Sequence, residues 1–254
     1  IGVCHMTTRD FGRLGVGVPY YKAHYEFWQW WSYLIAGGFR TGDRLLNNHR
    51  VPGEVPIPMA HNAIVREFLR HERLQTLCMI EDDHVADQDI VERMRSKQEN
   101  QDFDIVCASY VNRRENSHVA VGVNFAPGTD TEYGEYGMVI EPFKVATSGT
   151  QRCDVAALGL VLIRRWVLEA MLGDEDPEDF FWFDWLGRNS QDVRFYRKAQ
   201  RVGAKVGVDR DNAIGHIGKK IYYMDDFFRM RERLRQDLIA SGKWTDTEGA
   251  EHGY

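Results

Sequence analysis

The chain has 254 residues, of which 43% are hydrophobic and 28% charged, and a formal net charge of −6 at pH 7. This composition excludes a disordered or collagen-like chain and is typical of a globular protein with a full core. The pI of about 5.9 disfavours broad non-specific binding to nucleic acid, while a local basic patch stays compatible with it. The longest apolar run, residues 155–163, falls far short of the ~20 residues of a membrane span. We therefore expect no membrane span, and no secretory signal is visible behind Ile1.

In chain order, short apolar runs alternate with stretches of helical periodicity, which predicts one α/β domain with a central sheet covered by helices. The expected strands are residues 1–6, 44–47, 76–80, 105–110, 119–124, 137–140, 155–163 and 205–208. The expected helices are residues 20–36, 60–70, 88–97, 166–172 and 193–202, and a charged terminal helix at 224–240. We expect Pro19 near the start of the first helix, Asp87 as a helix cap, and the terminal helix packed across the domain.

The cysteines show no metal-binding or disulfide pattern. Cys4, Cys78, Cys107 and Cys153 each lie in or beside a short apolar run, and none forms a Cys-x-x-Cys pair. We predict buried free thiols, which favour a reducing, cytoplasmic compartment.

An acidic turn follows the expected strand 76–80, where Glu81, Asp82, Asp83 and His84 are consecutive. Two like charges about 4 Å apart cost roughly 4 kcal/mol at an effective dielectric near 20, so the cluster must be solvated, protonated or neutralised by a cation. Ligands bind at the carboxyl ends of strands in open α/β sheets, and such oxygen and imidazole groups suit Mg²⁺ or Mn²⁺. In an extended chain Glu81 and Asp83 would face one side and Asp82 and His84 the other, so two ligand frames are open. The alternative is a solvated helix N-terminus without a metal.

A second group of motifs lies downstream. Ser190, Gln191 and Asp192 open a helix, residues 203–209 follow it, and Gly215 precedes His216. This order resembles the GT-A fold glycosyltransferases, especially family-2-like and polypeptide N-acetylgalactosaminyltransferase-like members. These enzymes have a DxD or DxH turn after a buried strand, a later Glu-Asp pair that opens a helix, and a Gly-His pair whose histidine returns to the metal.

The resemblance covers residues 1–218, which we take as the GT-A domain, with residues 219–254 as a terminal helix and tail packed on it. Residues 58–65, with His61 where arginine is usual, are similar to the "ARN" helix start of this family, and residues 157–165 are similar to its glycine-bearing strand. Two positions depart from the pattern, because Glu81 replaces the first DxD aspartate and Gln191 replaces the glutamate of the Glu-Asp pair.

The resemblance implies a metal-dependent transfer of a sugar from a UDP- or GDP-sugar to an acceptor hydroxyl, with Mn²⁺ or Mg²⁺ as cofactor. It assigns Asp83, His216 and Asp82 to the metal and Asp192 to proton removal from the acceptor. The residues that it implies for nucleotide-sugar binding are Thr7, Arg9, Asn62, Glu81 and Gly159. In the aromatic segment before Asp192, Trp182 and Trp185 are candidates for an acceptor or lid surface, or for simple packing. The acceptor stays open among a glycan, a protein, a lipid and a modified nucleobase.

Two other functions compete with this interpretation. A nucleotidyltransferase would use a similar acidic turn, and the glycine-bearing residues 11–17 loosely imitate a phosphate loop, but the Lys-Ser/Thr pair is missing. A non-catalytic nucleotide-sugar or glycan binder of the same fold would also account for the two departures, at Glu81 and Gln191.

Overall fold

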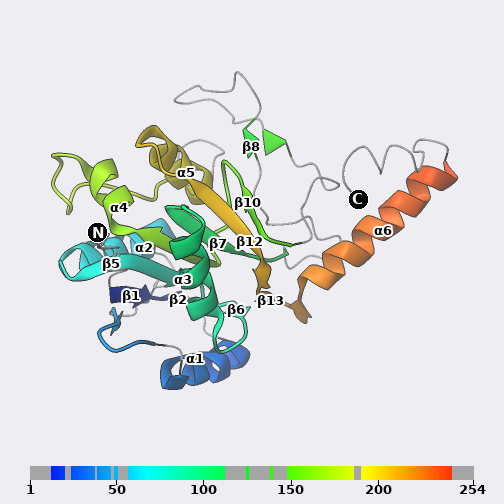
Figure 1. The fold of residues 1–254 in the computed structure, drawn as a ribbon, viewed down its shortest axis with the longest axis horizontal. Helices are drawn as coiled ribbons and strands as arrows, with labels where there is room; N and C mark the ends of the chain where they lie inside the picture. Colours follow the sequence, from blue (N-terminus) through cyan, green and yellow to red (C-terminus); the bar gives the residue numbers. More distant parts are fainter. Residues whose placement is uncertain are drawn as a thin grey trace, which may run out of the picture.

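The structure is a computed structural model that describes residues 13–20, 24–37, 39–46, 49–50, 57–111, 124–125, 138–139, 148–185 and 190–241. It has a mixed α/β architecture in which helices flank a seven-stranded central sheet (Figure 1). From one edge to the other, the strands are β3 (Arg44–Leu45), β1 (Arg13–Gly17), β5 (Leu74–Ile80), β11 (Leu160–Arg164), β7 (Ile105–Ser109), β12 (Val206–Ala213) and β10 (Thr150–Arg152). The β3–β1–β5 and β7–β12 neighbours are parallel, whereas β11 runs antiparallel to β5 and β7.

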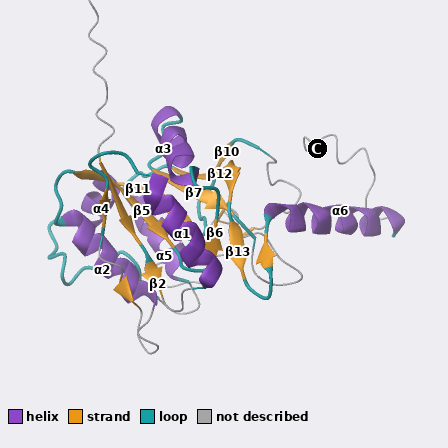
Figure 2. Ribbon diagram, turned by 90° about the horizontal axis from the view of Figure 1, so that it is seen from below, coloured by secondary structure: helices purple, strands orange, loops and turns teal. Residues whose placement is uncertain are grey.

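Helices cover both faces of the sheet (Figure 2). One face packs against α1 (Tyr25–Gly37) and α3 (Ile90–Asn100). The other packs against α2 (Ile57–Leu69), α4 (Arg165–Leu172) and α5 (Gln191–Arg201). Strands β7 and β11 and residues 77–80 of β5 are almost entirely apolar because both of their faces are buried.

Three smaller sheets complete the described part of the chain. The pair β2 (Pro19–Tyr20) and β4 (His49–Arg50) is parallel, and the pair β8 (Asn124–Phe125) and β9 (Met138–Val139) is antiparallel. The third sheet joins β6 (His84–Val85), β13 (Gly215–Ile217) and β14 (Ile221–Tyr222). It connects the acidic turn directly to the Gly-His segment.

The expected α/β fold with a central sheet and covering helices is confirmed, but the start of the chain differs from the prediction. No strand was expected at residues 11–17, whose glycines loosely imitate a phosphate loop, whereas Arg13–Gly17 form strand β1 in the sheet. Leu14 and Val16 are buried on one side, and a Cβ atom at Gly17 would lie 2.4 Å from the Ile64 side chain on the other. The glycine at 17 is therefore explained by the close approach of α2. The expected strand at residues 1–6 lies outside the described residues.

Two expected helix signals are wrong. Pro19 lies in strand β2, and α1 begins only at Tyr25. Asp87 does not cap a helix; α3 begins at Ile90, and the Asp87 carboxylate accepts a hydrogen bond from Arg93 instead.

The terminal helix α6 (Met224–Ala240) has the expected bounds but a different position. It points away from the sheet rather than lying across it (Figures 1 and 2). At its start, Met224 and Phe228 pack against the core. None of the helices in the described part of the chain is long and apolar enough to cross a membrane.

The described cysteines behave as expected. Cys78, Cys107 and Cys153 are buried and free, and burial raises the pKa of the Cys78 and Cys107 thiols to about 12. Cys4 lies outside the described residues.

Candidate active site

The acidic turn leaves the sheet at the carboxyl end of β5. The backbone N–H of Glu81 donates to the carbonyl of Gly159, 2.9 Å away, so the turn starts beside β11. The carbonyl of Asp83 accepts from the N–H of Ile217 at 2.7 Å, and His84 pairs with His216 in the β6–β13 ladder. Backbone pairing thus brings together two segments that are far apart in the sequence.

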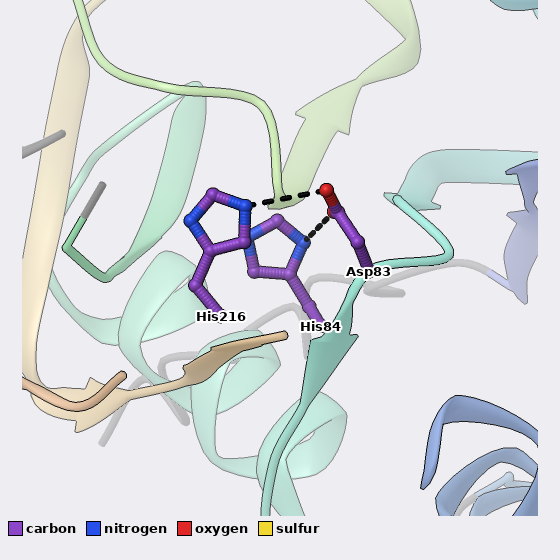
Figure 3. Close-up of side chains that lie close together, drawn as sticks. All are labelled: Asp83, His84 and His216. Carbon is purple, nitrogen blue, oxygen red and sulfur yellow. Dashed lines mark hydrogen bonds and ion pairs between the residues drawn. The ribbon is translucent and has the colours of Figure 1, made fainter. Parts of the chain in front are cut away.

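Three side chains of these segments converge (Figure 3). Nδ1 of His84 lies 2.9 Å from Oδ1 of Asp83, and Nε2 of His216 lies 3.2 Å from Oδ2 of the same carboxylate. The two imidazole rings stack with centroids 4.5 Å apart and an interplanar angle of 13°. One ligand atom from each residue lies within 4.8 Å of the others, a spacing compatible with one shared metal ion. Below we call Asp83, His84 and His216 the triad.

The protonation of His216 follows from its second contact. Its Nδ1 lies 2.8 Å from the carbonyl oxygen of Val111, and because a carbonyl only accepts, Nδ1 carries a proton. In the neutral ring Nε2 then has a lone pair directed at the Asp83 carboxylate. Two acceptors at this distance require a proton or a cation between them. A histidine that donates its other ring N–H to a backbone carbonyl is the usual arrangement of a metal ligand.

The electrostatics of Asp83 also favour a cation. Burial alone would raise the pKa of Asp83, but positive charge on the side of His216 and His84, supplied by a proton or a cation, outweighs burial and holds that pKa well below its usual range. The carboxylate is therefore ionised. Full protonation of both stacked rings would cost roughly 4 kcal/mol in repulsion at this spacing, so a divalent cation between neutral imidazoles fits the triad better than two imidazolium ions.

Tyr110 and Gly159 close one side of the triad. The buried Tyr110 ring lies edge-on to His84, with centroids 4.4 Å apart, and edge-on to His216 at 5.3 Å. A Cβ atom at Gly159 would lie 2.5 Å from Nε2 of His84 and 2.7 Å from Tyr110. The absence of a side chain at Gly159 is thus what allows His84 to reach its position. Tyr110 was not among the predicted site residues, because nothing in its surrounding sequence marks it.

Asp192 lies in the first turn of α5. Burial raises the pKa of its carboxyl group to about 6, although a helix N-terminus favours the ionised form. Burial is also the main cause of the raised pKa of Tyr110, and the charges of Glu81, Asp192 and Asp83 add to it. Asp192 therefore acts electrostatically on the same tyrosine that contacts both histidines of the triad.

The set of candidate metal ligands differs in part from the one expected from the sequence. The structure places Asp83 and His216 together, as predicted, and adds His84, whereas Asp82 is not in the group. Side chains alternate only in an extended chain, whereas residues 82 and 83 form a turn. The turn lets adjacent residues Asp83 and His84 reach the same point.

Glu81 faces a histidine rather than an arginine. Its Oε1 lies 3.8 Å from Nε2 of the fully buried His61, whose Nδ1 contacts the Ile57 carbonyl at 3.1 Å. Burial lowers the pKa of His61 to about 4, so this imidazole is neutral at pH 7. Glu81 itself is partly exposed beside the turn.

Two residues that were expected to bind ligands instead make hydrogen bonds to the backbone within the core. Asn62 donates to the Phe183 carbonyl at 2.7 Å and accepts from the Phe183 N–H at 3.0 Å, so its amide fastens α2 to the segment before α5. Trp182 has no exposed surface, and its indole N–H donates to the Leu168 carbonyl at 2.9 Å. The expectation that Trp182 forms an acceptor or lid surface is therefore corrected: it is a core residue.

The remaining predicted residues are placed as follows. Trp185 is 55% exposed and stays a candidate for an acceptor surface. Thr7 and Arg9, expected near the nucleotide, lie outside the described residues.

Comparison with known proteins supports the fold but no named family. No protein-family model matches the chain, and no curated protein sequence matches it. Among solved structures, A197 from STIV is similar over 83% of this chain and 93% of its own, with a TM-score of 0.51 and 13% identity. GalNAc-T7, solved with UDP, GalNAc and Mn²⁺, is similar over 82% of this chain and 43% of its own, with a TM-score of 0.52 and 12% identity. The chain therefore has a GT-A-like glycosyltransferase fold.

Proposed function

We propose that this protein is a metal-dependent glycosyltransferase that moves a sugar from a nucleoside-diphosphate sugar to an acceptor hydroxyl. The observation that carries the proposal is the triad at the carboxyl end of β5, in a GT-A-like sheet. A UDP- or GDP-sugar is the proposed donor, and UDP is bound in the similar GalNAc-T7 structure.

In this proposal Asp83, His84 and His216 hold Mn²⁺ or Mg²⁺, and Asp82 and Glu81 border the site. When bound, such a cation supplies electrostatic stabilisation of the charge on the departing diphosphate. The protein contributes the geometry: the β6–β13 pairing fixes both histidines, and the Val111 carbonyl keeps the proton of His216 on Nδ1.

Asp192 is the proposed base that removes the proton of the acceptor hydroxyl. A carboxyl group with a pKa of about 6 is mostly ionised at pH 7, and it binds a proton more readily than an ordinary aspartate. We propose Trp185 as part of the acceptor surface. Free thiols at Cys78, Cys107 and Cys153 support a cytoplasmic location, which we also propose.

The test is a screen of UDP- and GDP-sugars for thermal stabilisation of the protein in the presence of Mn²⁺, repeated in excess chelator. A ligand that binds the native state raises its stability by mass action. We expect at least one sugar nucleotide to stabilise the protein only with Mn²⁺, and to be hydrolysed slowly without acceptor. Binding without hydrolysis or transfer would indicate a non-catalytic binder, and no binding by any donor would contradict the proposal.

A further inference from the structure

A basic hollow lies where strands β1, β3 and β5 begin, at the amino-terminal ends of these strands. The triad lies at the other end, beyond the carboxyl end of β5. The hollow has a volume of about 420 Å³, and its lining includes Arg13, Arg44, Arg70, Arg73 and Glu72. Strand β5 has seven residues and runs from the hollow to the acidic turn. At a rise of about 3.3 Å per residue, the hollow lies roughly 20 Å from the triad, so the two sites are separate.

The arginines reach the hollow from three segments. Arg13 and Arg44 are the first residues of β1 and β3, and Arg70 and Arg73 lie in the turn between α2 and β5. Gly42 has a φ of +97°, and a Cβ atom there would lie 2.8 Å from Nε of Arg13. The glycine turn before β3 thus leaves room for the Arg13 side chain.

Within the described part of the chain, most of the positive charge in the hollow has no compensating carboxylate. Arg70 pairs with Glu178 at 2.8 Å and with Glu67 at 3.7 Å. In contrast, Arg13, Arg44 and Arg73 form no ion pair with any carboxylate in the described ranges.

The acids near these three arginines do not balance them. Asp43, next to Arg44, is held by Arg95 at 2.6 Å and by the N–H of Leu14 at 2.8 Å. Glu72 is the acidic residue of the lining, so three guanidinium groups against one carboxylate leave a charge of about +2, because arginine stays protonated in proteins.

The helix dipole does not account for this cluster. Cations are favourable at a helix C-terminus because they approach its last carbonyl groups. Here Arg165 performs that role: its guanidinium donates at 2.8 Å to the carbonyl of Leu69, the last residue of α2, and at 3.1 Å to the carbonyls of His71 and Leu74, which follow the helix. The arginines of the hollow are therefore not required to cap α2.

We propose that the basic hollow is a binding site for a phosphate group, separate from the donor site. Guanidinium groups pair with phosphate through two parallel hydrogen bonds, and several can share its oxygens. A phosphate monoester carries a charge of about −1.5 to −2 at pH 7, which matches the charge of the hollow, whereas a carboxylate would neutralise only half of it. The phosphate group belongs to a small phosphorylated ligand or to a nucleic-acid backbone, where two neighbouring diester groups with one negative charge each supply the same total charge, and the experiment separates these sources.

The experiment is calorimetric titration of the full chain with inorganic pyrophosphate, in excess chelator so that no metal is held by the triad. We expect saturable binding by the wild type. The double variant Arg44→Gln/Arg73→Gln should weaken it at least tenfold, because both residues are exposed and their loss leaves the core unchanged. The matched control Arg201→Gln, an exposed arginine at the end of α5, should bind like the wild type. Asp83→Asn should also bind like the wild type.

No pyrophosphate binding by the wild type, or equal affinity of the double variant, would overturn the proposal. Loss of binding in Asp83→Asn alone would overturn it as well, because the anion would then occupy the donor site. A competition with a single-stranded dT12 oligonucleotide identifies the source. If dT12 displaces pyrophosphate and binds more tightly, the ligand is a nucleic-acid backbone; if pyrophosphate stays bound, it is a small phosphorylated molecule. Neither result depends on glycosyl transfer, so the hollow is tested independently of the proposed function.

Discussion

The imidazole rings of His84 and His216 stack in parallel, 4.5 Å apart, because their backbones are paired directly across the β6–β13 ladder. This pairing aims one nitrogen of each ring at the Asp83 carboxylate. The position of His216 therefore depends on the pairing of β13 with β6, and not only on the local Gly-His motif that β13 contains.

The first prediction concerns metal binding. His216→Ala should lower the affinity for Mn²⁺ by more than the roughly 10–100-fold that outer partners of a metal ligand contribute, because it removes a ligand outright. Calorimetry with Mn²⁺ measures the effect. His71→Ala is the matched control, since His71 pairs with Glu67 near the start of β5, at the other end of that strand from the triad. Equal Mn²⁺ affinity of His216→Ala and the control would exclude His216 from the metal site.

The second prediction concerns the glycine beside the triad. Gly159→Ala should reduce Mn²⁺ affinity, because the new Cβ atom would lie 2.5 Å from Nε2 of His84 and push the ring away. Gly173→Ala is the control: Gly173 has a φ of +59° but no atom within 4 Å of the added Cβ. That variant should lose about 1–3 kcal/mol of stability through backbone strain and keep its Mn²⁺ affinity. The same Mn²⁺ affinity in both variants would refute a steric role for Gly159.

The third prediction is a pH dependence of stability that originates at His61. Its pKa is lowered to about 4 by burial, from 6.5 in the unfolded chain, so between these values the unfolded state binds more protons. His61 therefore makes its full contribution to the free energy of unfolding only above pH 6.5. About 3 kcal/mol of that free energy is lost as the pH falls from 6.5 to 4.

Urea unfolding at several pH values tests this. His61→Phe keeps an aromatic ring against Phe183, whose centroid lies 5.0 Å from that of His61, and removes the titrating group. The difference in unfolding free energy between wild type and variant should change by about 3 kcal/mol between pH 6.5 and pH 4. A constant difference would show that His61 is not held neutral. Asp192, with its raised pKa, contributes in the opposite direction in both proteins and cancels in the comparison.

The fourth prediction concerns Asp192. If it removes the acceptor proton, Asp192→Asn should lower kcat by roughly 10² to 10⁴ while donor and metal affinity stay nearly unchanged. The wild-type rate should rise with pH through about 6, the pKa of this group, and the variant should lose that rise. A fall in thermal stability as large as the fall in rate would indicate a structural role at the start of α5. A kcat within about threefold of the wild type, under 1 kcal/mol of barrier, would mean that Asp192 is not the base.

The sequence predicted those parts of the fold that local patterns determine. Helix α6 agrees with its predicted bounds at both ends, and α2 and α4 agree within a few residues, because their apolar residues recur at helical spacing. Strand β5 and the turn after it were identified because an apolar run ends abruptly in carboxylates.

Features that depend on contacts between distant segments could not be predicted. No strand was expected over Gly15 and Gly17, and only the close approach of α2 to strand β1 explains why glycine occupies both positions. Trp182 is buried because α4 offers the Leu168 carbonyl, and Asn62 is occupied because Phe183 folds back on α2. The inclusion of His84 in the triad depends on a turn and on a two-residue strand, which carry no periodic signal of their own.

The most direct test of the central claim is calorimetric binding of the sugar nucleotide selected by the stabilisation screen, measured with Mn²⁺ and with excess chelator, for the wild type and Asp83→Asn. This change keeps the size of the side chain and removes the charge that both histidines face. We expect the wild type to bind only with Mn²⁺, and Asp83→Asn to lose that binding while thermal unfolding shows that its fold is intact. Undiminished binding in chelator, or wild-type affinity in Asp83→Asn, would contradict the central claim.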